Sequence, residues 1–272
     1  MGEIFDLILV HPIINILVAV YGALFFLHIP YALGFAIIIL TIIIRFLIYP
    51  LMASQLKSSK KVQSLSPHLS RIKDKHKGDA KKLQAETMRL YKEHGVNPAA
   101  GCLPVIIQLP IIWALYSVLQ KIVGFNPKVV VSEINKIVYF DFIKLDQPWD
   151  PYFFGLPLGQ NPSQIISSIG AIVLLIPIAT GFFQFIQSKM MINKPEEPKD
   201  VAKKTEKKKE DFATAFQTQS MYIFPVMIGF FSFNFPVGLS LYWNTFTIFG
   251  IIQQYKISGL GGLKGWVNKI HG

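Results

Sequence analysis

The sequence predicts an all-α integral membrane protein: five transmembrane helices around a hydrophilic groove open to the cytoplasm, with a cytoplasmic helical hairpin. Of the 272 residues, 51% are hydrophobic and the mean hydropathy is +0.41, higher than in ordinary soluble domains. Five apolar stretches are long enough to cross about 30 Å of hydrocarbon as helices, which takes ~20 residues each. The net charge of +11 is carried mainly by the segments between these stretches.

The five predicted spans comprise residues 33–54, 101–123, 162–188, 213–233 and 238–256. The last two are joined by only a few residues, so we expect them to form a tight helical hairpin. Residues 1–32 contain a further apolar stretch, which carries Asp6, His11 and Pro12 and ends shortly before the first span. We expect this stretch to be a helix in the outer interface, with a second crossing as the alternative.

The distribution of Lys and Arg predicts the orientation. Segments 57–92 and 189–209 and the tail after Tyr255 hold 22 of the 27 basic residues, whereas the segments on the opposite side hold 4. Loops rich in Lys and Arg remain in the cytoplasm. We therefore expect a multi-pass protein of the cell's inner (plasma) membrane, with its N-terminus outside and its C-terminus in the cytoplasm.

The polar segments differ in character. Residues 55–100 show helical periodicity on both sides of a break at Gly78, and Ser66 and Pro67 are typical of a helix start, which together predict a basic hairpin. Its charged surface is either simply solvated or a docking site. The aromatic residues of loop 124–161 indicate an interfacial belt. Residues 189–212 are typical of a flexible linker, and residues 257–272 form a cytoplasmic tail.

Arg45 is the most informative residue, because it is a charge inside a predicted span. Such a charge costs ~2.5–3.5 kcal/mol at a helix centre and is a candidate for function. The alternative is that its side chain reaches the interface. However, Ser54, where the polar sequence begins, lies ~13 Å further along the helix, about twice the reach of arginine. A water-filled recess open to the cytoplasm is the simpler solution.

Polar residues in four spans provide walls for such a recess. Thr41 lies one helical turn before Arg45, and the second span contributes Gln108. The third and fifth spans each carry a polar stripe at helical spacing, and the stripes comprise Thr180, Gln184 and Gln187, and Ser240, Asn244 and Thr247. The alternative for each stripe is a hydrogen bond between neighbouring helices. Four such helices beside an arginine favour a shared cavity.

Several functional classes are disfavoured by absent residue types. None of the five predicted spans contains Asp, Glu or His, so Arg45 has no acidic partner there. A proton-coupled transporter normally needs a titrating group in a span. Cys102 is the only cysteine, and the motifs of proteases, hydrolases and nucleotide-binding enzymes are missing. We expect no enzyme activity, no catalytic or metal-binding residues and no cofactor.

Three stretches carry a resemblance to a known family. They are AIIILTIIIRFLIYPL around Arg45, NPAAGCLPVIIQLPIIWALY at residues 97–116 and FPVGLSLYWNTFTIFGIIQQ at residues 235–254. They are similar to the first, second and last core spans of the YidC/Oxa/Alb membrane protein insertases. The resemblance covers the chain from about residue 30 onward and is closest to bacterial members of the short form, without a large extracytoplasmic domain.

The resemblance implies that Arg45 attracts acidic residues of nascent membrane proteins, which then pass through the groove into the lipid bilayer. Gln187 and Trp243 match positions that line the family's groove, whereas Gln108 and Asn244 rest on the polar stripes alone. The ribosome and the Sec translocon are candidate partners. No small-molecule cofactor and no direct nucleic-acid specificity are implied.

Two other functions remain open on the sequence. One is a small-anion transporter or channel that uses Arg45 for selectivity, which requires a pore continuous to both sides. The other is a scaffold that docks ribosomes or the Sec channel through segment 57–92.

Overall fold

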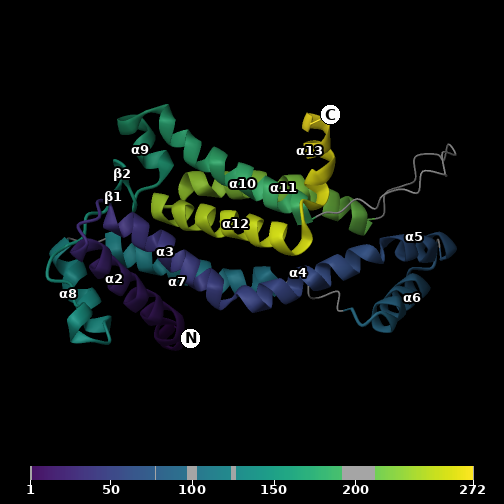
Figure 1. Cartoon of the computed structure of the whole chain (residues 1–272), viewed down its shortest axis with the longest axis horizontal. Coiled ribbons are helices and arrows are strands. Elements are labelled where there is room, and N and C mark those ends of the chain that lie inside the picture. Colours follow the sequence, from purple (N-terminus) through teal and green to yellow (C-terminus); the bar gives the residue numbers. More distant parts are fainter. Residues whose placement is uncertain (1, 77, 97–102, 124–126, 192–211, 272) are drawn as a thin grey trace. The chain divides into compact units, whose positions relative to one another are not determined.

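The computed structural model describes residues 2–76, 78–96, 103–123, 127–191 and 212–271, and these are almost entirely helical (Figure 1). They form two compact units. The first comprises Met1–Ile48, Val105–Gln184 and Phe224–Gly250, and the second comprises Tyr49–Pro104, Phe185–Ile223 and Ile251–Gly272. Three long helices contribute residues to both units: α10 (Leu175–Met191), α11 (Phe212–Asn234) and α12 (Val237–Ser258).

The first unit has a core formed by apolar side chains of its helices, among which Leu17, Leu33 and Leu115 are fully buried. Besides parts of α10, α11 and α12 it contains α1 (Gly2–Phe5), a π-helical turn (Asp6–Val10), α2 (His11–Phe26), α3 (Ala32–Leu47), nearly all of α7 (Leu103–Val123), α8 (Pro127–Ile137), a 3₁₀ turn (Asp141–Ile143), β1 (Tyr152–Phe153), β2 (Leu156–Pro157), α9 (Pro162–Ile169) and a 3₁₀ turn (Ala171–Leu174).

The helix α2 packs along α3 in the first unit (Figure 1). The π-helical turn precedes Pro12, which has no N–H to donate and whose ring would clash with the carbonyl of residue 8 in a regular α-helix. Asn15 is buried, and its Nδ2 donates to the carbonyls of His11 (2.9 Å) and Ile137 (3.1 Å). Its Oδ1 accepts from the backbone N–H of Tyr139 (2.7 Å), so α2 is fastened to the end of α8.

The first predicted span is interrupted. The helix pattern predicted one helix over residues 33–54, but α3 ends at Leu47 and α4 (Tyr49–Ser64) begins after Ile48. Pro50 explains the break, because it cannot donate to the carbonyl of Phe46 and its ring collides with that carbonyl in a straight helix. Arg45 therefore lies in the last turn of α3 rather than at the middle of a long helix.

The outer loop contains a small hairpin, in which Tyr152 pairs with Pro157 and Phe153 with Leu156. The Phe153 ring lies against Gly34 of α3, and a Cβ at residue 34 would overlap it. The aromatic residues predicted to form an interfacial belt divide into two groups. Phe142 and Phe154 are exposed, whereas Trp149 is buried, with its ring edge-on to Tyr21 at 5.5 Å between centroids.

The second unit contains the hairpin that the sequence predicted within residues 55–100. Its elements are α4, α5 (Ser66–Lys75), α6 (Ala80–Glu93), a 3₁₀ turn (Gly261–Leu263) and α13 (Lys264–His271), with parts of α10, α11 and α12. Leu65, Leu90 and Val96 form a small core between α5 and α6. Gly78 has φ +95°, which favours glycine, and Asp79 caps α6 by accepting from the backbone N–H of Lys82 (3.0 Å).

Two helices in the described ranges are long and apolar enough to cross a membrane, Glu3–Phe26 and Ala171–Met191. If α3 and α4 form one broken span, they are a third candidate for a membrane crossing. Met221–Asn234 is a shorter apolar helix. Glu3–Phe26 is therefore long and apolar enough to be a transmembrane helix, although we expected it to be an interfacial helix. Five crossings remain a prediction. Most of the predicted linker 189–212, and Cys102, lie outside the described residues.

Candidate functional site around Arg45

Arg45 is buried, with 3% of its surface exposed, and is held by one aromatic residue of α12. Its Nη2 donates to the backbone carbonyl of Phe246, and its Cζ lies 3.4 Å from the centroid of the Phe246 ring. The Phe249 ring lies further away, at 5.7 Å. The guanidinium is therefore stabilised by a carbonyl dipole and the negative face of a ring rather than by a countercharge.

No ion pair to Arg45 is formed by any residue in the described ranges, and its Nε is buried without a hydrogen-bond acceptor there. A buried charge without a countercharge is costly and strongly attracts an anion. An incoming carboxylate could take up both the Nε–H and an Nη–H of the guanidinium in a bidentate pair. The geometry thus leaves Arg45 able to bind a ligand oxygen.

Two consecutive residues of α12 form hydrogen bonds with different helices, because successive helical side chains point about 100° apart. The hydroxyl of Tyr242 accepts from Nε2 of Gln108 in α7 (2.9 Å), and Nε1 of Trp243 donates to Oε1 of Gln184 in α10 (3.2 Å). Oε1 of Gln108 and Oδ1 of Asn244 are buried and have no partner in the described part of the chain. These two acceptors complement the donors of Arg45 and suit bound water or a peptide N–H.

Thr41 and Ser240 have their hydroxyl groups engaged within the protein. Oγ1 of Thr41 donates to the carbonyl of Ile37 (2.6 Å), and the Ser240 hydroxyl lies 2.9 Å from that of Ser232. Ser232 in turn lies 3.2 Å from Oγ1 of Thr180, so a chain of hydroxyls joins α10, α11 and α12. This arrangement is the helix-to-helix bonding that was the alternative for the polar stripes.

The first unit contains seven of the eight predicted groove residues, and they are Thr41, Arg45, Gln108, Gln184, Ser240, Trp243 and Asn244. Gln187 belongs to the second unit, three residues after Gln184 in α10. Sequence reasoning missed Phe246 and Tyr242, which provide the ring over Arg45 and the hydroxyl beside Gln108. Their spacing of four residues places them on one face of the helix. An aromatic pair at that spacing usually belongs to the hydrophobic core, so the pattern did not mark them as groove residues.

Comparisons with known proteins identify the family of this chain. A family model described as 60Kd inner membrane protein matches residues 25–260. Membrane protein insertase YidC 2 of Bacillus anthracis is 34% identical over 234 residues, which cover 83% of this chain and 72% of the relative. Membrane protein insertase YidC of Fusobacterium nucleatum subsp. nucleatum is 32% identical over 228 residues, covering 84% and 87%.

A solved structure is similar as well. It is a crystal structure of an active YidC insertase with the first transmembrane domain resolved, with 26% identity and a TM-score of 0.50. The match covers 87% of this chain and 45% of that one, so this chain spans less than half of the solved protein. The family model covers nearly the whole chain, and the two relatives match most of their own length. The chain therefore belongs to the 60Kd inner membrane protein family, which is the family of the YidC membrane protein insertases.

Proposed function

We propose that this protein is a membrane protein insertase and chaperone. It receives segments of nascent membrane proteins in a hydrophilic groove that contains Arg45, and it releases them into the lipid bilayer. The observation that carries this proposal is a buried arginine whose described neighbours offer a ring and a carbonyl but no carboxylate. The names of the relatives support the same activity.

The charge of Arg45 would act on acidic residues near the translocated end of a substrate. Two opposite charges 4 Å apart interact by ~4 kcal/mol at an effective dielectric constant of about 20, which is several times their interaction in bulk water. A carboxylate would replace the Phe246 carbonyl as the partner of the guanidinium and would form the stronger, charge-assisted hydrogen bonds. Arg45 would thereby hold the acidic segment long enough for the following apolar segment to enter the lipid.

The unpaired acceptors of Gln108 and Asn244 would keep the groove hydrated. Water in the groove lowers the cost of moving a polar peptide, because that cost arises from leaving backbone and side-chain groups without hydrogen bonds in hydrocarbon. The other polar residues predicted to line the groove in the first unit, such as Gln184, would serve this purpose together with Trp243.

In this proposal the protein has five crossings, its N-terminus lies outside and its C-terminus in the cytoplasm of a bacterial cell. Its partners are nascent membrane proteins and the bilayer, and the ribosome and the Sec translocon are candidates for delivering the substrate. The alternative of a small-anion channel needs a polar path along the whole of α3. Leu33, Ile37 and Leu40, in the half of α3 before Arg45, are fully buried, which favours the insertase.

Insertion into proteoliposomes tests this function. Two substrates that differ only in acidic or neutral residues in the translocated tail are inserted by the wild type, Arg45→Ala and Arg45→Lys. We expect Arg45→Ala to lower insertion of the acidic substrate about tenfold or more, as for the loss of a charge-assisted contact, and to spare the neutral one. Arg71→Ala, in α5 of the hairpin, is the matched control. Equal insertion of both substrates by Arg45→Ala would remove charge attraction from the mechanism.

A further inference from the structure

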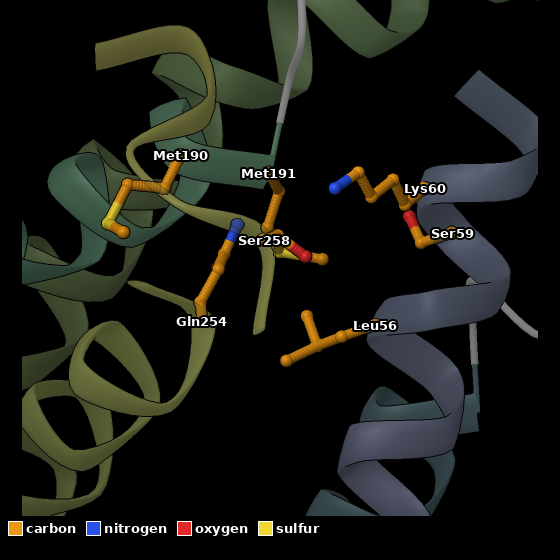
Figure 2. Close-up of a pocket in the computed structure, with 7 residues that line it drawn as sticks. All are labelled: Leu56, Ser59, Lys60, Met190, Met191, Gln254 and Ser258. Atoms are coloured by element: carbon orange, nitrogen blue, oxygen red, sulfur yellow. The ribbon is translucent and has the colours of Figure 1, made fainter. Parts of the chain in front are cut away.

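A pocket in the second unit shares no residue with the Arg45 site. It lies between α4, α10 and α12. Its enclosed part has a volume of only about 10 Å³, and the empty space reaches about 250 Å³ when the open solvent at its mouth is included. Figure 2 shows its lining residues, which are Leu56, Ser59, Lys60, Met190, Met191, Gln254 and Ser258. Three helices that are distant in the sequence thus present side chains to one small volume.

The polar part of the lining consists of groups that can donate hydrogen bonds. They are an ammonium from Lys60, hydroxyls from Ser59 and Ser258, and the amide of Gln254, and there is no carboxylate among them. Lys60 extends from α4 toward Met191 and Ser258 (Figure 2). A donor-rich wall of this kind suits an anion that has several acceptor oxygens.

The helices around the pocket add to this preference. Neither α4, α10 nor α12 contains Asp or Glu, whereas they carry five lysines, Lys57, Lys60, Lys61, Lys189 and Lys256. Charges of one sign around a recess raise the local concentration of the opposite sign. Of these five lysines only Lys60 lines the pocket, and the ammonium of Lys189 lies over the Trp266 ring, 2.7 Å from its centroid. Lys60 is therefore the charge that an anion in the pocket would meet directly.

The apolar part of the lining distinguishes among anions. Leu56, Met190 and Met191 face the same pocket, and Met190 is buried, with 3% of its surface exposed. Methionine side chains are flexible and polarisable, so they adapt to irregular apolar shapes. A small inorganic anion has no apolar group to pack against these three side chains, whereas a phosphate that carries glycerol and acyl chains has.

The pocket lies where two helices change from apolar to polar sequence. In α10 the first charged residue is Lys189, beside Met190, and in α12 the apolar run ends at Gln253, followed by Gln254, Tyr255 and Lys256. Tyr255 is 57% exposed, and exposed Tyr next to Lys is typical of helix ends at the level of lipid headgroups. Basic pockets between transmembrane helices at this level bind anionic headgroups.

We propose that this pocket binds the headgroup of an anionic phospholipid, with the phosphate on Lys60, Ser59 and Ser258 and the glycerol and first acyl carbons against Leu56 and the two methionines. Such a lipid would bind whether or not a substrate occupies the groove, so its binding is separate from the insertase function. A bound lipid would lie in the open mouth of the pocket, against α4, α10 and α12. An acidic peptide is the competing occupant, and it lacks the acyl chain that the apolar wall accommodates.

The test uses the purified, delipidated full-length chain in a neutral detergent. Native mass spectrometry counts the lipids retained after equilibration with phosphatidylglycerol or with phosphatidylcholine of the same acyl chains. We expect the wild type to retain phosphatidylglycerol preferentially and Lys60→Gln to weaken its retention about fivefold, as for one lysine near an anionic lipid. Lys61→Gln, the next residue of α4 and not in the pocket, is the control and should change little. Ser258→Leu, which fills the pocket, should weaken retention too.

Four outcomes would overturn the proposal. Equal losses in Lys60→Gln and Lys61→Gln would mean attraction by diffuse surface charge. Equal retention of the two lipids by the wild type would remove the charge preference. Displacement by glycerol 3-phosphate at the concentration of the lipid would assign the pocket to a soluble phosphate, and displacement by a soluble acidic peptide would assign it to a substrate. None of these outcomes depends on insertion activity, so the proposed function is tested separately.

Discussion

The carbonyl of Phe246 accepts a hydrogen bond from Arg45, and the ring of the same residue covers the guanidinium at 3.4 Å. One residue of α12 therefore provides both the dipole and the aromatic face that offset the burial of a charge. Both interactions are weaker than an ion pair in the same place, so they stabilise the guanidinium without competing strongly with an incoming carboxylate.

Replacing the ring over Arg45 should destabilise the first unit. Phe246→Leu keeps an apolar side chain but removes the cation–π contact, so we expect the free energy of unfolding to fall by ~1–2 kcal/mol. Phe249→Leu is the matched control, because that ring lies 5.7 Å from the Arg45 Cζ, and it should have a smaller effect. Thermal unfolding in detergent measures both. Identical losses in the two variants would show that the ring acts only as packing.

The hydrogen bond from Gln108 to the hydroxyl of Tyr242 should couple α7 to α12. Gln108→Leu and Tyr242→Phe each remove one partner, so each should be destabilising, and the double variant should lose less than the sum. We expect a coupling energy of ~1 kcal/mol from the double-mutant cycle, measured by thermal or denaturant unfolding. Additive losses would mean that the two groups do not interact in the folded protein.

The contact between Gly34 and Phe153 should hold the outer hairpin on α3. Gly34→Ala places a methyl group where the Phe153 ring lies, so the ring must leave and loop 139–157 should become more sensitive to protease. Phe153→Leu in the Gly34→Ala background should restore part of the protection.

Gly22→Ala is the control for the Gly34 variant, because nothing lies within 4 Å of the Cβ it would add. It should leave the loop protected. If Gly34→Ala also left protection unchanged, the hairpin would not depend on this contact.

The cap of α6 should depend on pH. The backbone N–H of Lys82, and then its ammonium, hold the pKa of Asp79 below its ordinary value of 3.8. The capping contribution is therefore complete above the unfolded value and is lost as the pH falls through the lower folded value. Amide hydrogen exchange should show the first turn of α6 opening only at acid pH. Asp79→Asn keeps a capping oxygen without a titrating group and should abolish this dependence, and persistence of the dependence would locate its origin elsewhere.

Sequence periodicity predicted the hairpin of α5 and α6 and the helical segment around Arg45, because those depend on local signals such as Pro67, Gly78 and a charge in an apolar run. It did not predict the break after Leu47, although Pro50 was the signal for it. Periodicity also could not decide whether Ser240 faces water or another hydroxyl, since a polar stripe indicates only a direction on the helix. That outcome depends on which helix packs opposite Ser240. Here it is α11, whose Ser232 hydroxyl lies beside the Ser240 hydroxyl.

The family follows from long motifs and the whole-chain match, whereas the role of each groove residue does not. Trp149 illustrates the difficulty. Its place in an aromatic loop indicated an interfacial position, but it is buried against Tyr21, because residues that are far apart in the sequence pack together there.

The proposed insertion mechanism requires Arg45 to receive acidic residues of the substrate. The most direct measurement is disulfide crosslinking of a stalled nascent chain to Asn244→Cys, in a chain with Cys102→Ser, with the substrate cysteine placed beside its acidic residue. We predict efficient crosslinking with Arg45, and a decrease of about tenfold either in Arg45→Ala or when the acidic residue is replaced by its amide. Crosslinking that is equally efficient in all three cases would show that Arg45 does not receive the acidic residue.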